Sequence, residues 1–249
     1  EMHGFIHMFE DTPEFVARHI IREARSYMDS LPPPFFRALV NYAQDGSYSW
    51  HCPGHSGGVA FLKSPVGQMF HQFFGENMLR ADVCNAVDEI GQLLDHTGPV
   101  AQSELNAARI FNADHSYFVT NGTSTSNKII WHASVTPGDI VLVDRNCHKS
   151  VIHAITMTGA IPVFLMPTRN NLGIIGPIPL EEFDPENIRK KIAQNPIAQN
   201  RKMEIGDDDV LIPKILTITQ STYDGILYNV EMIKDHLTGH IDTLHFDEA

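Results

Sequence analysis

From residue 116 onward, short apolar runs alternate with helical patterns, and this alternation constrains the fold more than any other feature. The runs that we interpret as strands are 116–120, 139–144, 161–166, 214–220 and 243–248. Helical patterns follow at 123–135, 148–159, about 180–194 and 230–240. The runs are continuously apolar instead of alternating, which is typical of a parallel sheet with helices on both faces. We therefore predict an α/β fold with a mostly parallel sheet.

The N-terminal half is less regular. Residues 11–30 show the signals of a helix, because Asp11 and Glu14 have the spacing of a capping box and Pro13 suits the first turn. A further helical pattern covers 84–110, interrupted at "DHTGP". The segment 195–209 is polar and aperiodic, so we predict a surface loop there.

Charge and composition exclude several classes of protein. The formal net charge of −12 argues against nucleic acid as a partner, since phosphate binding needs an excess of Lys and Arg. No apolar run approaches the roughly 20 residues of a membrane span, and the first residues lack a secretion signal. Cys52, Cys84 and Cys147 are widely spaced without a CxxC pair, which favours a reduced, cytoplasmic setting.

The predicted sheet indicates where a ligand binds, because ligands of open α/β sheets lie beyond the carboxyl ends of the strands. One such end carries Gly122 followed by four hydroxyl residues, and a helix begins there. Thr123 and Ser124, with the free N–H groups of the first turn, are suited to a phosphate group. Hydroxyls at a helix start also serve as simple caps, and the sequence leaves both interpretations open.

Two further strand ends carry His148 and Asp247. A buried carboxylate such as Asp247 needs a partner, which is either an ion pair, a helix N-terminus or a protonated ring nitrogen. Pyridoxal 5′-phosphate (PLP) has such a nitrogen, and a carboxylate beside it preserves the ring as an electron sink. His148 lies at a helix start, where a neutral ring is favoured, and it is either a capping group or a flat surface beside a cofactor.

The loop "HCPGHSGG" contains residue types that ligate metals. His51, Cys52 and His55 lie within it, and His71 follows further along the chain. No HxH, HExxH or CxxC spacing joins them, whereas a catalytic zinc needs three protein ligands around an open position. We predict no metal site.

Several blocks together are similar to the bacterial PLP-dependent ornithine, lysine and arginine decarboxylases of the aspartate-aminotransferase fold type. The resemblance runs from about residue 35 to the last residue and rests on seven blocks in family order: "HCPGHSGGVAFLKSPVG", "LLDHTGP", "VTNGTSTSNK", "VDRNCHKS", "PTRNNLGIIGPIP", "STYDGILYN" and "LHFDEA". It implies an N-terminal linker helix region at 1–34 and a truncated PLP-binding major domain at 35–249.

The resemblance also implies residue roles. Thr123 and Ser124 bind the cofactor phosphate with help from the Gly122 backbone, His148 stacks on the pyridine ring, and Asp247 pairs with its nitrogen. The lysine that binds PLP covalently follows the acid in the family, beyond residue 249. Lys149 and Lys128 belong to the histidine and phosphate blocks, so we reject both for that role.

The function implied is decarboxylation of a basic amino acid, arginine or lysine before ornithine, by a homodimer or higher homo-oligomer. Because the chain opens on Glu1 and stops after "LHFDEA", we expect it to be an inactive piece of a longer protein. Two alternatives stay open, namely a non-catalytic relative acting as a binding or regulatory subunit, and another fold-type-I enzyme such as an aminotransferase.

Overall fold

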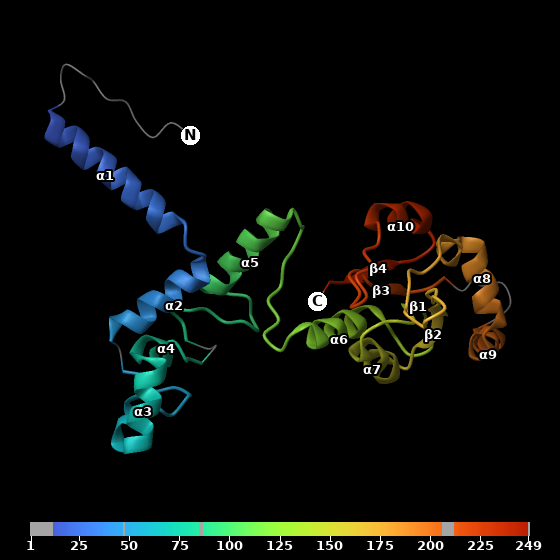
Figure 1. The fold of residues 1–249 in the computed structure, drawn as a ribbon, viewed down its shortest axis with the longest axis horizontal. Helices are drawn as coiled ribbons and strands as arrows, with labels where there is room; N and C mark the ends of the chain where they lie inside the picture. The colour runs from blue at the N-terminus through green and yellow to red at the C-terminus, as the bar shows by residue number, and fades with distance from the viewer. Residues whose placement is uncertain (1–11, 47, 85–86, 206–211, 249) are drawn as a thin grey trace. The chain divides into compact units, whose positions relative to one another are not determined.

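The computed structural model describes residues 12–46, 48–84, 87–205 and 212–248, with backbone alone for 201–205 (Figure 1). The chain forms two compact units that divide between Phe118 and Val119, and each is described by itself. Within the described residues, no helix has the length and apolar character needed to cross a bilayer. The predicted division at residue 34 stays a prediction.

The first unit is helical. Its elements are α1 (Pro13–Ser30), α2 (Pro34–Asp45), the 3-10 helix η1 (Val59–Lys63), α3 (Pro65–Phe74), α4 (Glu76–Arg80) and α5 (Gly98–Phe111). Asp11 of the predicted capping box lies outside the described residues. The N-cap of α1 is Thr12, whose Oγ1 accepts a hydrogen bond from the Phe15 N–H at 3.3 Å.

The predicted helix over 84–110 is wrong in its first half, where the described residues up to Thr97 form turns and irregular backbone. Gly91 and Gly98 adopt left-handed φ angles of +84° and +61°, so the backbone folds back on itself. A Cβ at Gly91 would lie 2.2 Å from the Thr97 carbonyl oxygen, so only glycine permits this close approach. The helical pattern therefore becomes a helix only from Gly98.

The second unit contains a four-stranded sheet, β1 (Ile140–Asp144), β2 (Ile161–Leu165), β3 (Ile215–Thr219) and β4 (Thr243–Asp247), in the order β2-β1-β3-β4. All neighbouring strands are parallel, with Ile140 opposite Ile161, Val141 opposite Ile215 and Thr219 opposite Asp247. The prediction of a parallel α/β sheet is therefore confirmed.

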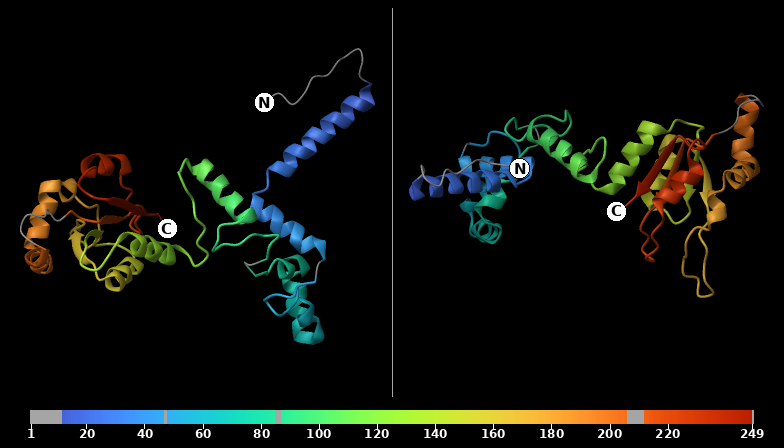
Figure 2. Two further views of the ribbon diagram at one scale, coloured as in Figure 1. Left: turned by 180° about the vertical axis from the view of Figure 1, so that it is seen from behind. Right: turned by 90° about the horizontal axis from the view of Figure 1, so that it is seen from above.

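Helices cover both faces of this sheet, as Figure 1 shows. On one face, here the α6–α7 face, α6 (Thr123–Ser134) and α7 (Lys149–Thr158) pack around Trp131 and Val151. On the other, the α8–α10 face, lie the 3-10 helix η2 (Leu180–Phe183), α8 (Pro185–Gln194), α9 (Pro196–Ile205) and α10 (Val230–Leu237). The connections that follow β2 and β3 project as loops, each closed by one antiparallel bridge (Figure 2).

Two predictions for this part of the chain are wrong. The predicted strand over residues 116–120 does not form: the segment is irregular and ends in a turn, and no described strand pairs with it. Residues 196–205 form helix α9 instead of a loop, and the rest of the predicted loop up to 209 lies outside the described residues. Asn195 starts this helix, since its Oδ1 accepts hydrogen bonds from the N–H groups of Ile197 and Ala198.

Candidate functional site

The candidate site lies at the carboxyl end of the sheet. The strand order reverses between β1 and β3, and this is the position at which open α/β sheets bind ligands. At this edge β1 ends at Asp144 and β4 ends at Asp247. Helix α6 begins after Gly122, and α7 begins after His148.

Asp247 is held by a residue that the sequence analysis did not single out. Its side chain is 7% exposed, and Oδ2 accepts a hydrogen bond of 3.0 Å from Nδ2 of Asn127 in α6. The same Nδ2 donates to Oγ of Ser150 in α7, also at 3.0 Å. The Asp247 carboxylate is therefore paired with the uncharged amide of Asn127. Among the described residues, no Lys, Arg or His forms an ion pair with it.

Ser150 continues this connection to His148. The backbone N–H of Ser150 donates to His148 Nδ1 at 3.2 Å, and Ser150 Oγ lies 2.8 Å from the same nitrogen. Because an N–H group can only donate, Nδ1 acts as the acceptor, and the hydroxyl donates its hydrogen to it as well. A neutral His148 consequently carries its proton on Nε2.

These contacts connect two of the predicted residues, Asp247 and His148, through two that were not predicted. Asp247, Asn127, Ser150 and His148 form one continuous hydrogen-bonded series, which we call the Asp247–His148 chain. Asn127 lies one helical turn beyond Thr123, so the hydroxyl-rich first turn of α6 belongs to the same helix face. The helix period was the available signal for Asn127, because positions 123 and 127 are four apart.

The first turn of α6 is not capped by its own hydroxyls. Gly122 is the N-cap with φ +77°, and no side chain of the described residues caps the helix. The N–H groups of Thr125 and Ser126 bond to the Gly122 carbonyl, at 2.9 and 3.3 Å. Thr123 is exposed and Ser124 is half-buried, and neither hydroxyl has a partner among the described residues. A Cβ added at Gly122 meets nothing within 4 Å, so this helix end is open to a ligand.

Buried polar atoms at the strand ends are also left without partners. Three buried oxygens have no hydrogen-bond partner among the described residues, namely Asp144 Oδ2, Thr219 Oγ1 and Gln220 Oε1. Thr219 is opposite Asp247 in the ladder, so its side chain is on the same face of the sheet. Burial raises the pKa of Asp144, and the Asn146 N–H that donates to its Oδ1 at 2.7 Å opposes that shift.

A second buried polar series lies behind Asp247 on the α6–α7 face. Trp131 Nε1 donates to Thr217 Oγ1 at 3.1 Å, and Thr217 Oγ1 lies 3.1 Å from Nδ1 of His245. Burial lowers the pKa of His245, and the nearby Asp247 charge opposes the shift. A neutral imidazole therefore stands two residues before the acid, on the same face of β4.

One thiol and two lysines also lie near this edge of the sheet, and we assign none of them a reactive role. Burial and the charge of Asp144 raise the pKa of the Cys147 thiol to about 11, so it stays protonated at neutral pH. Lys149 is exposed on α7 and Lys128 is half-buried on α6. Our rejection of both lysines as the covalent cofactor lysine stays a prediction.

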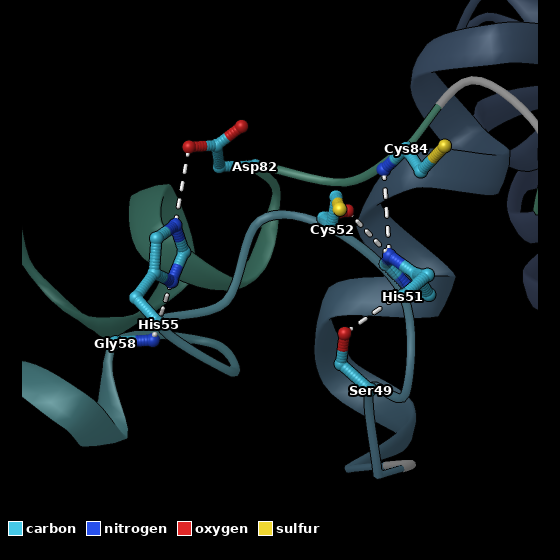
Figure 3. Close-up of polar contacts among 7 residues, drawn as sticks. All are labelled: Ser49, His51, Cys52, His55, Gly58, Asp82 and Cys84. Atoms are coloured by element: carbon cyan, nitrogen blue, oxygen red, sulfur yellow. Dashed lines mark hydrogen bonds and ion pairs between the residues drawn. The ribbon is translucent and has the colours of Figure 1, made fainter.

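The histidines of the loop in the first unit hydrogen-bond both within the loop and to residues outside it (Figure 3). His55 Nδ1 accepts from the Gly58 N–H at 3.0 Å, and its Nε2 lies 3.2 Å from Asp82 Oδ2. His51 contacts the Cys52 carbonyl through Nδ1 and the Tyr42 hydroxyl through Nε2, each at 2.7 Å. In the part of the chain that the structure describes, no three His, Cys, Asp or Glu residues are grouped in a way that suits a metal ion.

Comparison with known proteins adds an independent line of observation. Residues 33–249 match the family model described as "Orn/Lys/Arg decarboxylase, major domain". The chain is 57% identical over 249 residues to lysine decarboxylase LdcA of Pseudomonas aeruginosa, covering 100% of this chain and 32% of that protein. It is 43% identical over 245 residues to the biodegradative arginine decarboxylase of Escherichia coli, covering 98% of this chain and 32% of the relative.

A solved structure agrees with these matches. Lysine decarboxylase A from Pseudomonas aeruginosa superposes with a TM-score of 0.81 at 55% identity, covering 97% of this chain and 31% of the solved chain. The chain thus spans about a third of the length of the relatives it matches. The expected likeness to basic-amino-acid decarboxylases is confirmed.

Proposed function

The chain belongs to the ornithine/lysine/arginine decarboxylase family, and from this premise we propose that the complete protein is a PLP-dependent enzyme that releases CO₂ from a basic amino acid. The observation that carries the proposal is the Asp247–His148 chain, which joins an acid, an imidazole and the helix with the open N-terminus. PLP, when bound, supplies an electron sink for the bond that is broken.

Each residue has a role in this proposal. The backbone of Gly122 and the hydroxyls of Thr123 and Ser124 hold the phosphate at the N-terminus of α6, where the helix dipole favours an anion. Asp247 accepts a hydrogen bond from the protonated ring nitrogen and keeps that nitrogen positively charged. His148 presents its imidazole to the ring and orients the substrate carboxylate through the Nε2–H group.

We propose lysine as the first substrate to test, then arginine and ornithine. The identity of 57% to a lysine decarboxylase exceeds that of 43% to an arginine decarboxylase over nearly the same residues. The groups that bind the distal end of the substrate are not among the residues assigned above.

The test is a product assay on full-length protein purified with PLP. We expect a cofactor absorption band near the visible and release of CO₂ and the matching diamine or agmatine when all three amino acids are offered together. Absence of both band and CO₂ would overturn the proposal, whereas a keto-acid product would identify an aminotransferase.

A substitution tests the role of the acid. Asp247→Ala should lower turnover by about 100-fold or more, because the ring nitrogen loses its counter-charge, while phosphate-anchored PLP still binds. Asp242→Asn is the control, since this carboxylate lies just before the same strand and pairs with Lys214 at 2.7 Å, at the amino end of the sheet. Unaltered turnover in Asp247→Ala would refute the assigned role.

We also propose that the full-length protein is a cytoplasmic homo-oligomer. Helix α3 supports this, because Val66, Met69 and Phe73 are 78%, 72% and 82% exposed at helical spacing, and exposed apolar side chains grouped in this way are typical of a contact surface. Sedimentation of the full-length protein should show a dimer or larger species, and Phe73→Lys should weaken the association. A monomer at micromolar concentration contradicts the proposal.

A further inference from the structure

We propose that Asn127 is a positioning residue that directs the Asp247 carboxylate toward the ring nitrogen of the cofactor, and that Ser150 holds Asn127 in place. This inference rests on the proposed function, because it assigns a task to residues that stand behind the predicted cofactor contacts. Neither residue touches the predicted ligand positions at Thr123 or Ser124 through a hydrogen bond.

The geometry of Asn127 leaves it one orientation. A carboxamide nitrogen carries two hydrogens, and here one is donated to Asp247 Oδ2 and the other to Ser150 Oγ, both at 3.0 Å. A rotated amide would place its oxygen against the carboxylate oxygen, and two acceptors repel each other. Because Asn127 is only 3% exposed, water does not replace either bond.

Ser150 fixes the far end of this arrangement. Its hydroxyl accepts from Asn127 and donates to His148 Nδ1 at 2.8 Å, so both of its roles are determined. The side chain is 1% exposed and sits in the first turn of α7. A displacement of Asp247 therefore disturbs contacts on α6 and α7 together, which restrains the carboxylate more than a single bond would.

The second oxygen of Asp247 is the one left for a ligand. Among the described residues, Asn127 is the one hydrogen-bond partner of this side chain, and it uses Oδ2. With Oδ2 fixed, the direction of Oδ1 is set by the geometry of the carboxylate group. Asn127 thus has a directional role toward the ring nitrogen in addition to its contribution to packing.

The experiment measures binding of two cofactors to full-length apoprotein, PLP and its 1-deaza analogue, in which carbon replaces the ring nitrogen. Fluorescence titration gives both dissociation constants, and their ratio reports the contact between Asp247 and the nitrogen. We expect wild type to prefer PLP by about 10-fold or more, as for a hydrogen bond to a charged group. Asn127→Leu should lower this preference to about 3-fold or less, and Ser150→Ala should lower it partially.

The matched control is Ser126→Ala, a change at the neighbouring, half-buried position of α6, which should leave the preference unchanged. Circular dichroism establishes that each variant is folded. Should Asn127→Leu fail to fold, Ser150→Ala carries the test, since it removes a single oxygen atom.

The outcomes separate this inference from the proposed function. Wild-type apoprotein that binds neither compound overturns both. Equal binding of both compounds by wild type overturns the role of Asp247 and with it that of Asn127. A preference for PLP that persists in Asn127→Leu and Ser150→Ala, or affinities that fall in parallel at a constant ratio, overturns the positioning role and leaves the proposed function intact.

Discussion

The two faces of the sheet in the second unit differ in the kinds of side chain that they bury. On the α8–α10 face, fourteen fully or nearly buried apolar side chains form one cluster, among them Leu142, Leu216 and Phe183. On the α6–α7 face, the apolar cluster has seven buried members, and buried polar groups lie beside it. Trp131 takes part in both kinds of contact, since its ring packs in the apolar cluster and its Nε1–H group donates a hydrogen bond to Thr217 Oγ1.

This difference indicates that one face mainly stabilises the fold and the other mainly positions the residues of the candidate site. Apolar burial is non-directional and tolerates small shifts, so the α8–α10 face is suited to holding the strands together. Hydrogen bonds between buried groups demand defined positions and are costly when a partner is missing. The α6–α7 face therefore fixes the positions of Asp247 and His148, and the other face supplies most of the buried apolar surface.

The largest effect should come from the α8–α10 face. Phe183 is 2% exposed and lies edge-on to Tyr228, with ring centroids 6.4 Å apart. Phe183→Ala should lower the free energy of unfolding by about 3–5 kcal/mol, because it removes buried apolar surface and leaves a cavity. Urea unfolding of the full-length protein measures the change.

Leu180→Ala is the control for this substitution. Leu180 lies on the same short helix η2 but is 53% exposed, so the expected change is within about 0.5 kcal/mol. Similar losses in both variants would show that the cluster on this face does not carry the stability that we assign to it.

A smaller effect is expected on the α6–α7 face from the loss of one buried hydroxyl. Thr217→Val keeps the side-chain shape but leaves Trp131 Nε1 without its acceptor and His245 Nδ1 without its partner. The free energy of unfolding should fall by about 1–3 kcal/mol, the usual result of stranding a buried polar group. Denaturant unfolding followed by tryptophan fluorescence is the measurement.

The neighbouring threonine of β3 provides a matched comparison. Thr219 Oγ1 is buried without a partner, so Thr219→Val removes an unsatisfied group and should be neutral or stabilising. If the two substitutions cost the same, the hydrogen bonds of Thr217 contribute nothing beyond the shape of its side chain.

The regular parts of this unit were predictable from the sequence because their signals are local. The four strands of the sheet and helices α6, α7 and α10 were predicted within a few residues, since continuous apolar runs and helical periods alternate there. Helix α9 was missed because its residues have no amphipathic pattern, and it packs through the buried Ala198 with Asn195 as its start. Residues 116–120 have strand composition, but a strand also needs a neighbour with which to pair.

The site was predictable only in part for a related reason. Gly122, His148 and Asp247 stand at element ends, where the sequence marks them by their neighbours. Asn127 and Ser150 lie within helices. The helix period places Asn127 on the same face as Thr123, but no local pattern contains the contacts that these two residues make between α6, α7 and β4. The assigned ligand contacts of Gly122, Thr123, Ser124, His148 and Asp247 stay predictions.

The smallest expected effects concern pH, and they have opposite signs on the two faces. On the α6–α7 face, burial lowers the pKa of His245 below its ordinary value of 6.5. As pH falls below about 6.5, the unfolded chain binds a proton at this imidazole that the folded chain does not bind, so stability is lost. His245→Gln should therefore flatten the decline in the free energy of unfolding on the acid side.

Asp144 provides the opposite case, and its position in β1 places it on the α8–α10 face with Ile140 and Leu142. Burial raises its pKa above 3.8, so the folded chain holds a proton that the unfolded chain has released. Stability is then lost as pH rises from 3.8 through the raised value, and Asp144→Asn should be more stable than wild type at neutral pH. Urea midpoints measured from about pH 4 to 8 for wild type and both variants test this. Relative to wild type, His245→Gln should gain stability as pH falls below 6.5, and Asp144→Asn should gain stability as pH rises above 3.8. If both variants gain stability in the same pH direction, the assignment of one burial-shifted group to each face is wrong.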